Sequence, residues 1–192
     1  MKCSVYIATS LDGFIARPDG GIDWLPMPKA GEDDYGYGEF MATVDVVIMG
    51  RNTFELALSF GRWPYDKPVI VLSSRRDALP SRLPPLVRAA SGTPDDILAD
   101  IGQTSARHAY VDGGVTIQRF LEAGRIDQLI ITRIPVLIGA GIPLFGALSR
   151  DVRLQHAMTR HFPNGLVQSE YLIAPSEPSS SCIKPLGGRE AS

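Results

Sequence analysis

The chain has 192 residues, of which 44% are hydrophobic and 21% charged, with a formal net charge of −2. This length and composition favour one globular domain with a sizeable core, and the near-balanced charge argues against a dedicated nucleic-acid-binding protein or a membrane-surface protein. No apolar run approaches the roughly 20 residues of a membrane helix, and the first residues are typical of a strand rather than of a signal peptide. We therefore expect a cytoplasmic protein with no nucleic-acid or membrane partner.

Residues 1–174 are expected to form the domain, and residues 175–192 a tail outside the core, because the tail is rich in proline, serine and glycine. The two cysteines are Cys3, in the first expected strand, and Cys182, in the tail. A disulfide between these opposite ends of the chain is not expected.

Short β-branched and apolar runs predict the first strands of a sheet. They lie at residues 3–9, 44–49, 68–73 and 108–111. Continuous runs of this kind are typical of strands that are covered on both faces.

Apolar residues at helical spacing predict helices between these strands, around Phe40, Phe54 and Phe120. A further helix is expected to begin at Thr93-Pro94-Asp95-Asp96 and to end at Gly102. A capping hydroxyl, a proline in the first turn and two acids all favour a helix N-terminus.

The pattern changes after Asp127. Residues 127–139 are predicted to form one long apolar strand, while residues 166–173 and part of 152–161 alternate between apolar and polar side chains. Three late strands with no helix between them predict an antiparallel addition to the sheet. The expected fold is therefore α/β, a mixed and mostly parallel sheet flanked by helices, with antiparallel C-terminal strands.

Four segments at expected strand ends carry chemical information, because open α/β sheets bind ligands at such ends. The first contains Gly50, Arg51 and Thr53, which follow a strand and open a helix. Glycine permits close approach of the backbone, the N–H groups of a helix start favour a phosphate, and Arg51 and Thr53 add a charge and a hydroxyl. The alternative is an ordinary turn with a solvated arginine.

The second segment is Ser73-Ser74-Arg75-Arg76, again at the end of a strand. Serines and arginines suit an extra ribose phosphate, and the absence of an acid there disfavours NADH, whose free 2′-hydroxyl usually meets a carboxylate. The segment therefore favours NADPH. The alternative is a polar loop.

The third segment is Asp112-Gly113-Gly114-Val115-Thr116, in which a strand enters a helix through two glycines. Paired glycines let the backbone turn sharply and contact a diphosphate. The spacing is not that of the six-residue GxGxxG fingerprint, so an ordinary Rossmann domain is not indicated. A plain turn is the alternative.

The fourth segment runs from Ala8 to Gly13 and is followed by the glycine-rich stretch 17–23. A strand that ends in small polar residues, followed by such a loop, is suited to line a nicotinamide site and to supply a lid. A surface hairpin is the alternative.

The order of these segments resembles the dihydrofolate reductase superfamily. The resemblance rests on MGRNTFE at residues 49–55, VIVLSS at 69–74 and VDGG at 111–114, and it spans about residues 2–173. SLDG at 10–13 and PVLIGAGIPLF at 135–145 are similar to the riboflavin-biosynthesis reductase branch, which includes the C-terminal domain of bifunctional deaminase-reductases.

The resemblance implies an NADPH-dependent oxidoreductase that transfers a hydride from nicotinamide C4 to an electrophilic carbon of a small-molecule substrate. It implies that Gly50, Arg51 and Thr53 contact the cofactor phosphates, and that Ser73, Ser74 and Arg75 contact the adenosine 2′-phosphate. It also implies that Gly113, Gly114, Val115 and Thr116 contact the diphosphate, and that Ala8 lies beside the nicotinamide. It also implies a cis peptide bond between the two glycines and a possible homodimer. Ser10, Asp12 and Trp24 are expected on the substrate side.

Two hypotheses compete for the substrate. Dihydrofolate reductases pair the pterin with an acid on the helix before MGR. Asp34, sixteen residues before Gly50, matches that acid, and Thr132 matches the threonine that supports it. The alternative is that Glu32, Asp33 and Asp34 form the acidic first turn of a surface helix.

The hypothesis we favour is the riboflavin one, reduction of 5-amino-6-(5-phosphoribosylamino)uracil, although no phosphate site on the substrate side can be assigned. The zinc pattern of the deaminase half is absent from the sequence, and the three histidines have no metal-ligand spacing, so no metal site is expected. A hypothesis of another class is a non-catalytic nucleotide-binding module.

Overall fold

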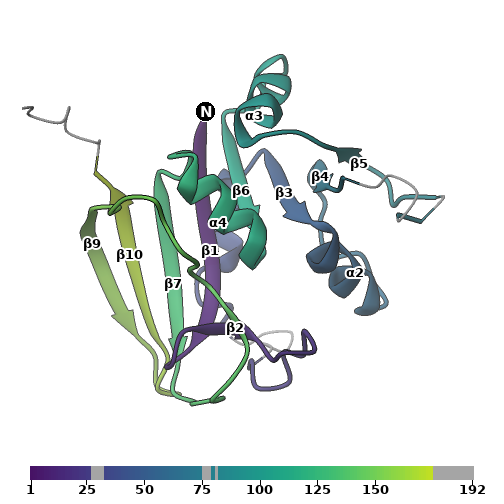
Figure 1. The fold of residues 1–192 in the computed structure, drawn as a ribbon. Helices are drawn as coiled ribbons and strands as arrows, with labels where there is room; N and C mark the ends of the chain where they lie inside the picture. Colours follow the sequence, from purple (N-terminus) through teal and green to yellow (C-terminus); the bar gives the residue numbers. More distant parts are fainter. Residues whose placement is uncertain (27–32, 75–78, 81, 175–192) are drawn as a thin grey trace, which may run out of the picture.

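The computed structural model describes residues 1–26, 33–74, 79–80 and 82–174. Within these residues the chain forms an eight-stranded sheet and a two-stranded sheet (Figure 1). The strands are β1 (Lys2–Ser10), β2 (Phe14–Ala16), β3 (Val46–Gly50), β4 (Val69–Leu72), β5 (Val87–Ala90), β6 (His108–Asp112), β7 (Gln128–Ile134), β8 (Ile142–Pro143), β9 (Leu154–His161) and β10 (Val167–Ile173). The helices are α1 (Tyr37–Thr43), α2 (Arg51–Ser59), α3 (Pro94–Gly102) and α4 (Gly114–Glu122).

The large sheet has the strand order β5-β4-β3-β6-β1-β7-β10-β9. Neighbours from β5 to β7 are parallel, and β10 is antiparallel to both β7 and β9. The expected mixed and mostly parallel sheet is thereby confirmed. The expected antiparallel C-terminal strands are confirmed as well, and β7 joins them to the parallel part of the sheet, because it is antiparallel to β10. It pairs in parallel with β1, with Ala8 opposite Thr132.

Two hydrophobic clusters cover the two faces of the sheet. On one face, α3 and α4 bury Ile97 and Phe120 against the strands. On the other face, α1 and α2 bury Phe40 and Phe54, and Phe40 packs edge-on against the ring of Tyr110. Burial on both faces explains the continuous apolar runs of the central strands.

The start of α3 follows the sequence prediction. Asp96 N donates to Thr93 Oγ1 at 3.2 Å, and Thr93 N donates to Asp96 Oδ2 at 2.9 Å, which completes a capping box. The helix ends at Gly102, as expected.

The predicted strand at 127–139 is too long, because β7 ends at Ile134. Pro135 has no N–H group for a further ladder bond, and Val136 N donates back to the carbonyl of Ile134 at 2.8 Å. Gly139 then turns the chain with a φ of +75°. Three strands escaped prediction: β5 is short and interrupted by Arg88, while β2 and β8 have three and two residues.

Cys3 is a buried free thiol in the core, and burial raises its pKa to about 12. Cys182 and the predicted tail at 175–192 lie outside the described residues. Among the described helices, none has the length and apolar character needed to span a membrane.

Candidate functional site

The carboxyl ends of the parallel strands open onto a cleft of about 920 Å³. Ala8 reaches it from β1, Gly50 from β3, Leu72 from β4 and Asp112 from β6. Crevices at this edge of an α/β sheet are the usual place for a ligand.

The residues predicted to contact a cofactor gather in this cleft. Ten of the eleven line it, namely Ala8, Gly50, Arg51, Thr53, Ser73, Ser74, Gly113, Gly114, Val115 and Thr116. The eleventh, Arg75, lies outside the described residues, as does its neighbour Arg76. Segments far apart in the sequence thus form one surface.

Two helices begin at the cleft. α2 begins at Arg51 directly after β3, and α4 begins at Gly114 directly after β6. Neither helix has a side-chain hydrogen bond at its N-cap. The first N–H groups of both helices are therefore available to a ligand, and the helix dipoles favour an anion there.

The glycines at these helix starts sit in close contact with neighbouring side chains. A Cβ at Gly50 would lie 3.0 Å from Thr116 Oγ1, and a Cβ at Gly113 would lie 2.2 Å from Thr53 Oγ1. Gly113 has a φ of +88°, a conformation that side chains disfavour. No larger residue therefore fits at Gly113 without displacement of Thr53.

The prediction of a cis peptide bond between Gly113 and Gly114 was wrong, because the described residues contain no cis peptide bond. The positive φ of Gly113 supplies the turn into α4 with a trans bond.

Sequence reasoning missed several polar residues of the cleft, among them Asn52, Ser91 and Arg119. Arg119 Nη2 donates to the carbonyl of Gly92 at 2.9 Å, which ties α4 to the loop after β5. With Arg51, it brings a second cation to the cleft. The only sequence signal for Arg119 was its place five residues after Gly114, in the last turn of α4.

Asp112 is an acid of the cleft with a raised pKa. Burial raises its pKa to about 6, and the hydroxyl of Tyr65 lies 3.4 Å from its Oδ2. An acid that titrates near neutral pH in a ligand cleft is suited to proton transfer. Asp112 belonged to the glycine motif in the sequence, but nothing there revealed its burial.

The structure does not support the catalytic prediction for Asp34. Its side chain is exposed, outside the cleft, and its two carboxylate oxygens accept the N–H groups of Gly36 and Gly38 at 2.9 and 2.8 Å. Asp34 thus organises the start of α1, which corresponds to the surface-helix alternative. Asp34 and Thr132 also do not form the expected pair. Thr132 is buried, and its Oγ1 accepts a hydrogen bond from Gln168 Nε2 at 3.0 Å, whereas Asp34 is exposed.

Two residues predicted on the substrate side hold loops together. Ser10 is buried, and its Oγ accepts the N–H of Phe14 at 3.0 Å. Asp12 accepts the N–H of Gly139 at 2.8 Å. Neither residue lines the cleft.

Trp24, the third residue predicted on the substrate side, does not line the cleft, although Ile22 and Leu25 beside it do. Its indole Nε1 is buried with no hydrogen-bond partner in the described part of the chain.

Among the described residues, no three histidine, cysteine, aspartate or glutamate side chains cluster in a way that could hold a metal ion.

Comparisons with known proteins agree with this architecture. The model of the RibD C-terminal domain family matches residues 2–168. The uncharacterized protein YwjB of Bacillus subtilis (strain 168) is similar, with 36% identity over 176 residues that cover 90% of this chain and 98% of the relative.

Two solved structures are similar as well. A putative riboflavin biosynthesis protein from Shewanella sp. PV-4 has a TM-score of 0.85 at 41% identity, over 91% of this chain and 100% of that one. Dihydrofolate reductase from Enterococcus faecalis, complexed with NADP(H) and RAB-propyl, has a TM-score of 0.62 at 18% identity, over 91% of this chain and 97% of that one. The second likeness concerns the fold alone, and it confirms the expected dihydrofolate-reductase-like architecture.

Proposed function

The chain belongs to the RibD C-terminal domain family, and from this premise we propose that it is an NADPH-dependent reductase of the riboflavin-biosynthesis type. The observation that carries the proposal is that the predicted cofactor residues from four separate strand ends line one cleft. The proposed substrate is 5-amino-6-(5-phosphoribosylamino)uracil, whose ribose is reduced to a ribityl chain. A homodimer and a cytoplasmic location stay predictions.

The residues of the cleft fit a dinucleotide phosphate. Its volume of about 920 Å³ lies within the usual range for small-molecule and cofactor sites. The uncapped starts of α2 and α4 suit the phosphates, and the close packing at Gly113 leaves backbone rather than side chain on the surface. Arg51 and Arg119 add positive charge.

The preference for NADPH rests on the end of β4. Ser73 and Ser74 line the cleft there, and the sequence continues with Arg75 and Arg76. Two hydroxyls and two cations suit a 2′-phosphate, which NADH lacks.

When bound, NADPH would supply a hydride to an electrophilic carbon of the substrate. The protein's share is to hold both molecules in the cleft and to provide the proton that balances the added hydride. We assign the proton to Asp112, whose raised pKa keeps a fraction of the carboxyl protonated near neutral pH. The proton goes to the heteroatom bonded to the reduced carbon, because that heteroatom gains electron density when the hydride is added.

A turnover panel tests the proposed function. The purified protein is mixed with NADPH and either the aminouracil phosphate, dihydrofolate or a pterin, and the loss of reduced nicotinamide absorbance is followed. The proposal expects turnover with the aminouracil phosphate and none with the other two. Turnover of dihydrofolate alone would favour a dihydrofolate or pteridine reductase, and NADPH binding without any turnover would favour a nucleotide-binding module.

A further inference from the structure

The two cations that line the large cleft within the described residues, Arg51 and Arg119, differ in their surroundings. Arg51 Nε lies 3.6 Å from Glu55 Oε1, one turn further along α2. Among the described residues, no acid forms an ion pair with Arg119. An anionic ligand therefore meets a partly compensated charge at Arg51 and an uncompensated charge at Arg119.

Arg119 is held against the loop that follows β5. Its Nη2 donates to the carbonyl of Gly92 at 2.9 Å, and both residues line the cleft. A guanidinium has five N–H groups, and this bond uses one of them. The bond to Gly92 therefore fixes the side chain at the cleft and leaves N–H groups for a ligand.

The loop that Arg119 contacts lies beside the end of β4. The strands β4 and β5 are parallel neighbours, so both end at the cleft. Ser73 N donates to the carbonyl of Ala90 at 3.0 Å, and Gly92 follows Ala90 by two residues. Arg119 thus reaches the part of the cleft for which the proposed function assigns the 2′-phosphate.

The helix α4 carries both its uncapped start and Arg119 on the side of the cleft. Arg119 lies three residues after Thr116, which also lines the cleft, so the two share one helix face. Gly114 and Arg119 are separated by five residues, or about 7.5 Å along the helix. Helical side chains lean toward the N-terminus, which shortens the distance from the guanidinium to the helix start.

The covalent structure of NADPH matches this spacing. Its diphosphate and its 2′-phosphate are attached to C5′ and C2′ of the same ribose, so one sugar ring separates them. A diphosphate at the start of α4 therefore brings the 2′-phosphate within reach of a long side chain on the same helix. Two N–H groups of a guanidinium also match two oxygens of a phosphate.

We propose that Arg119 is a specificity-determining residue that binds the adenosine 2′-phosphate. The helix α4 then spans the ribose, with the diphosphate at its start and the 2′-phosphate at Arg119. NADH has a hydroxyl at this position and offers Arg119 no charge. The inference rests on the proposed function, because it takes the nucleotide to be bound with its diphosphate at α4, and it uses no contact of Arg75 or Arg76.

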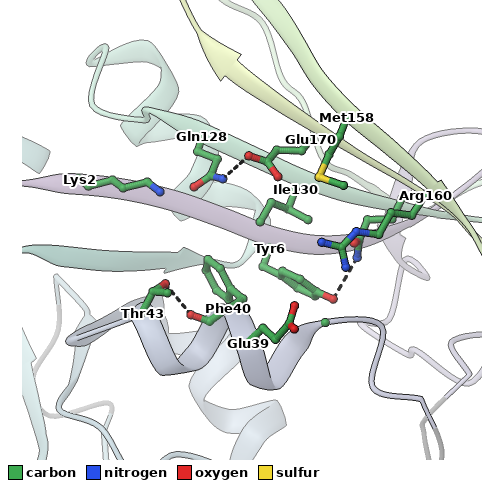
Figure 2. A pocket seen from close by; sticks show the side chains of 12 residues that line it. Lys2, Tyr6, Glu39, Phe40, Thr43, Gln128, Ile130, Met158, Arg160 and Glu170 are labelled. Carbon is green, nitrogen blue, oxygen red and sulfur yellow. Dashed lines mark hydrogen bonds between the residues drawn. The ribbon is translucent and has the colours of Figure 1, made fainter.

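A matched control comes from a second hollow, a groove of about 210 Å³ between α1 and the strands β1, β7, β10 and β9 (Figure 2). None of the residues that line it also lines the large cleft. Figure 2 shows Arg160 of β9 at this groove, and Arg160, like Arg119, forms no ion pair with any described residue. Arg160→Gln thus makes the same charge change away from the nucleotide.

The test is calorimetric titration of the full-length protein with two pairs of ligands. NADPH and NADH form one pair, and adenosine 2′,5′-bisphosphate and adenosine 5′-phosphate form the other, which has no nicotinamide. The members of each pair differ only in the 2′-phosphate. The proteins are the unmodified chain, Arg119→Gln, Arg119→Lys, which keeps the charge and loses the planar fork, and the control Arg160→Gln.

Arg119→Gln should lower the preference for the 2′-phosphate at least about fivefold in both pairs and leave the affinities for NADH and adenosine 5′-phosphate unchanged. Arg119→Lys should lose less of the preference, and Arg160→Gln none.

A structural role for Arg119, as a tie between α4 and the loop at Gly92, would weaken both members of each pair equally. That result, or an unchanged preference in Arg119→Gln, would overturn the inference. Failure of the proposed function looks different, because a protein that binds adenosine 2′,5′-bisphosphate through Arg119 and turns over no substrate would contradict the reductase and support the role of Arg119.

Discussion

Asp112 is the residue on which the proposed proton transfer depends. Asp112→Asn keeps the shape of the side chain and removes its proton, so turnover should fall at least about a hundredfold, the lower end for general acids. In the unmodified enzyme the rate should decline as pH rises through about 6, where Asp112 loses its proton. The check is the pH profile of single-turnover NADPH oxidation, and an unchanged profile in Asp112→Asn would remove Asp112 from the mechanism.

The same carboxyl should affect stability. Its pKa of about 6 in the folded protein is above the ordinary 3.8, so folding favours the protonated form. That contribution is present below pH 3.8 and is lost as pH rises through about 6, by at most about 3 kcal/mol in the free energy of unfolding. Asp112→Asn should therefore be more stable than the unmodified protein at pH 8, measured by urea unfolding. Equal stability of the two proteins at pH 8 would mean that the carboxyl is better solvated than the structure indicates.

Gly113 and Gly61 form a matched pair of glycines. Both have positive φ, +88° and +80°, but only at Gly113 would a Cβ meet a neighbour, Thr53 Oγ1 at 2.2 Å. Each substitution by alanine should cost about 1–3 kcal/mol of stability through the backbone. Gly113→Ala must also displace Thr53 in the cleft, so its NADPH affinity should fall at least about tenfold, or 1.4 kcal/mol. Isothermal titration calorimetry measures this, and an equal loss of affinity in Gly61→Ala would attribute the effect to strain alone.

At the scale of elements, the capping box of α3 allows a direct test. Thr93→Ala removes the acceptor for Asp96 N and should lower the free energy of unfolding by about 1 kcal/mol. Thr93→Ser keeps the hydroxyl and should lose much less. Urea denaturation of the three proteins measures the difference, and identical losses in both variants would show that the hydroxyl contributes nothing to the helix.

Elements could be predicted where the local sequence alone decides the structure. Thr93 and Pro94 fix the start of α3, and the central strands are long apolar runs because both faces of the sheet are covered. β5 and the pair β2 and β8 could not be predicted, because they exist through pairing with distant partners rather than through their own residues. The end of β7 at Ile134 could have been predicted from the sequence, because Pro135 has no N–H group to continue the ladder.

At the scale of the whole molecule, the cleft was predictable because each of its glycine-rich or hydroxyl-rich turns follows a strand, and parallel strands bring such turns to one edge. The position of the Asp34 side chain was predicted incorrectly, because local hydrogen bonds decide it. Position along the chain matched an acid of the resembling family, but the glycines at 36 and 38 offer backbone N–H groups that hold its carboxylate at the start of α1. The proton transfer proposed for Asp112 could not be predicted from the sequence, because it depends on a pKa that is raised by burial in the assembled fold.

We propose that NADPH binds in this cleft with its 2′-phosphate at the end of β4. Calorimetric titration of the protein with NADPH and with NADH tests it most directly, alongside Arg75→Ala, Arg76→Ala and a control with Arg62→Ala, Arg153→Ala. We expect NADPH to bind at least about tenfold more tightly than NADH, or 1.4 kcal/mol, and only the Arg75→Ala, Arg76→Ala variant to lose this preference. Equal affinities in the unmodified protein, or no binding of either nucleotide, would show that the end of β4 does not select NADPH.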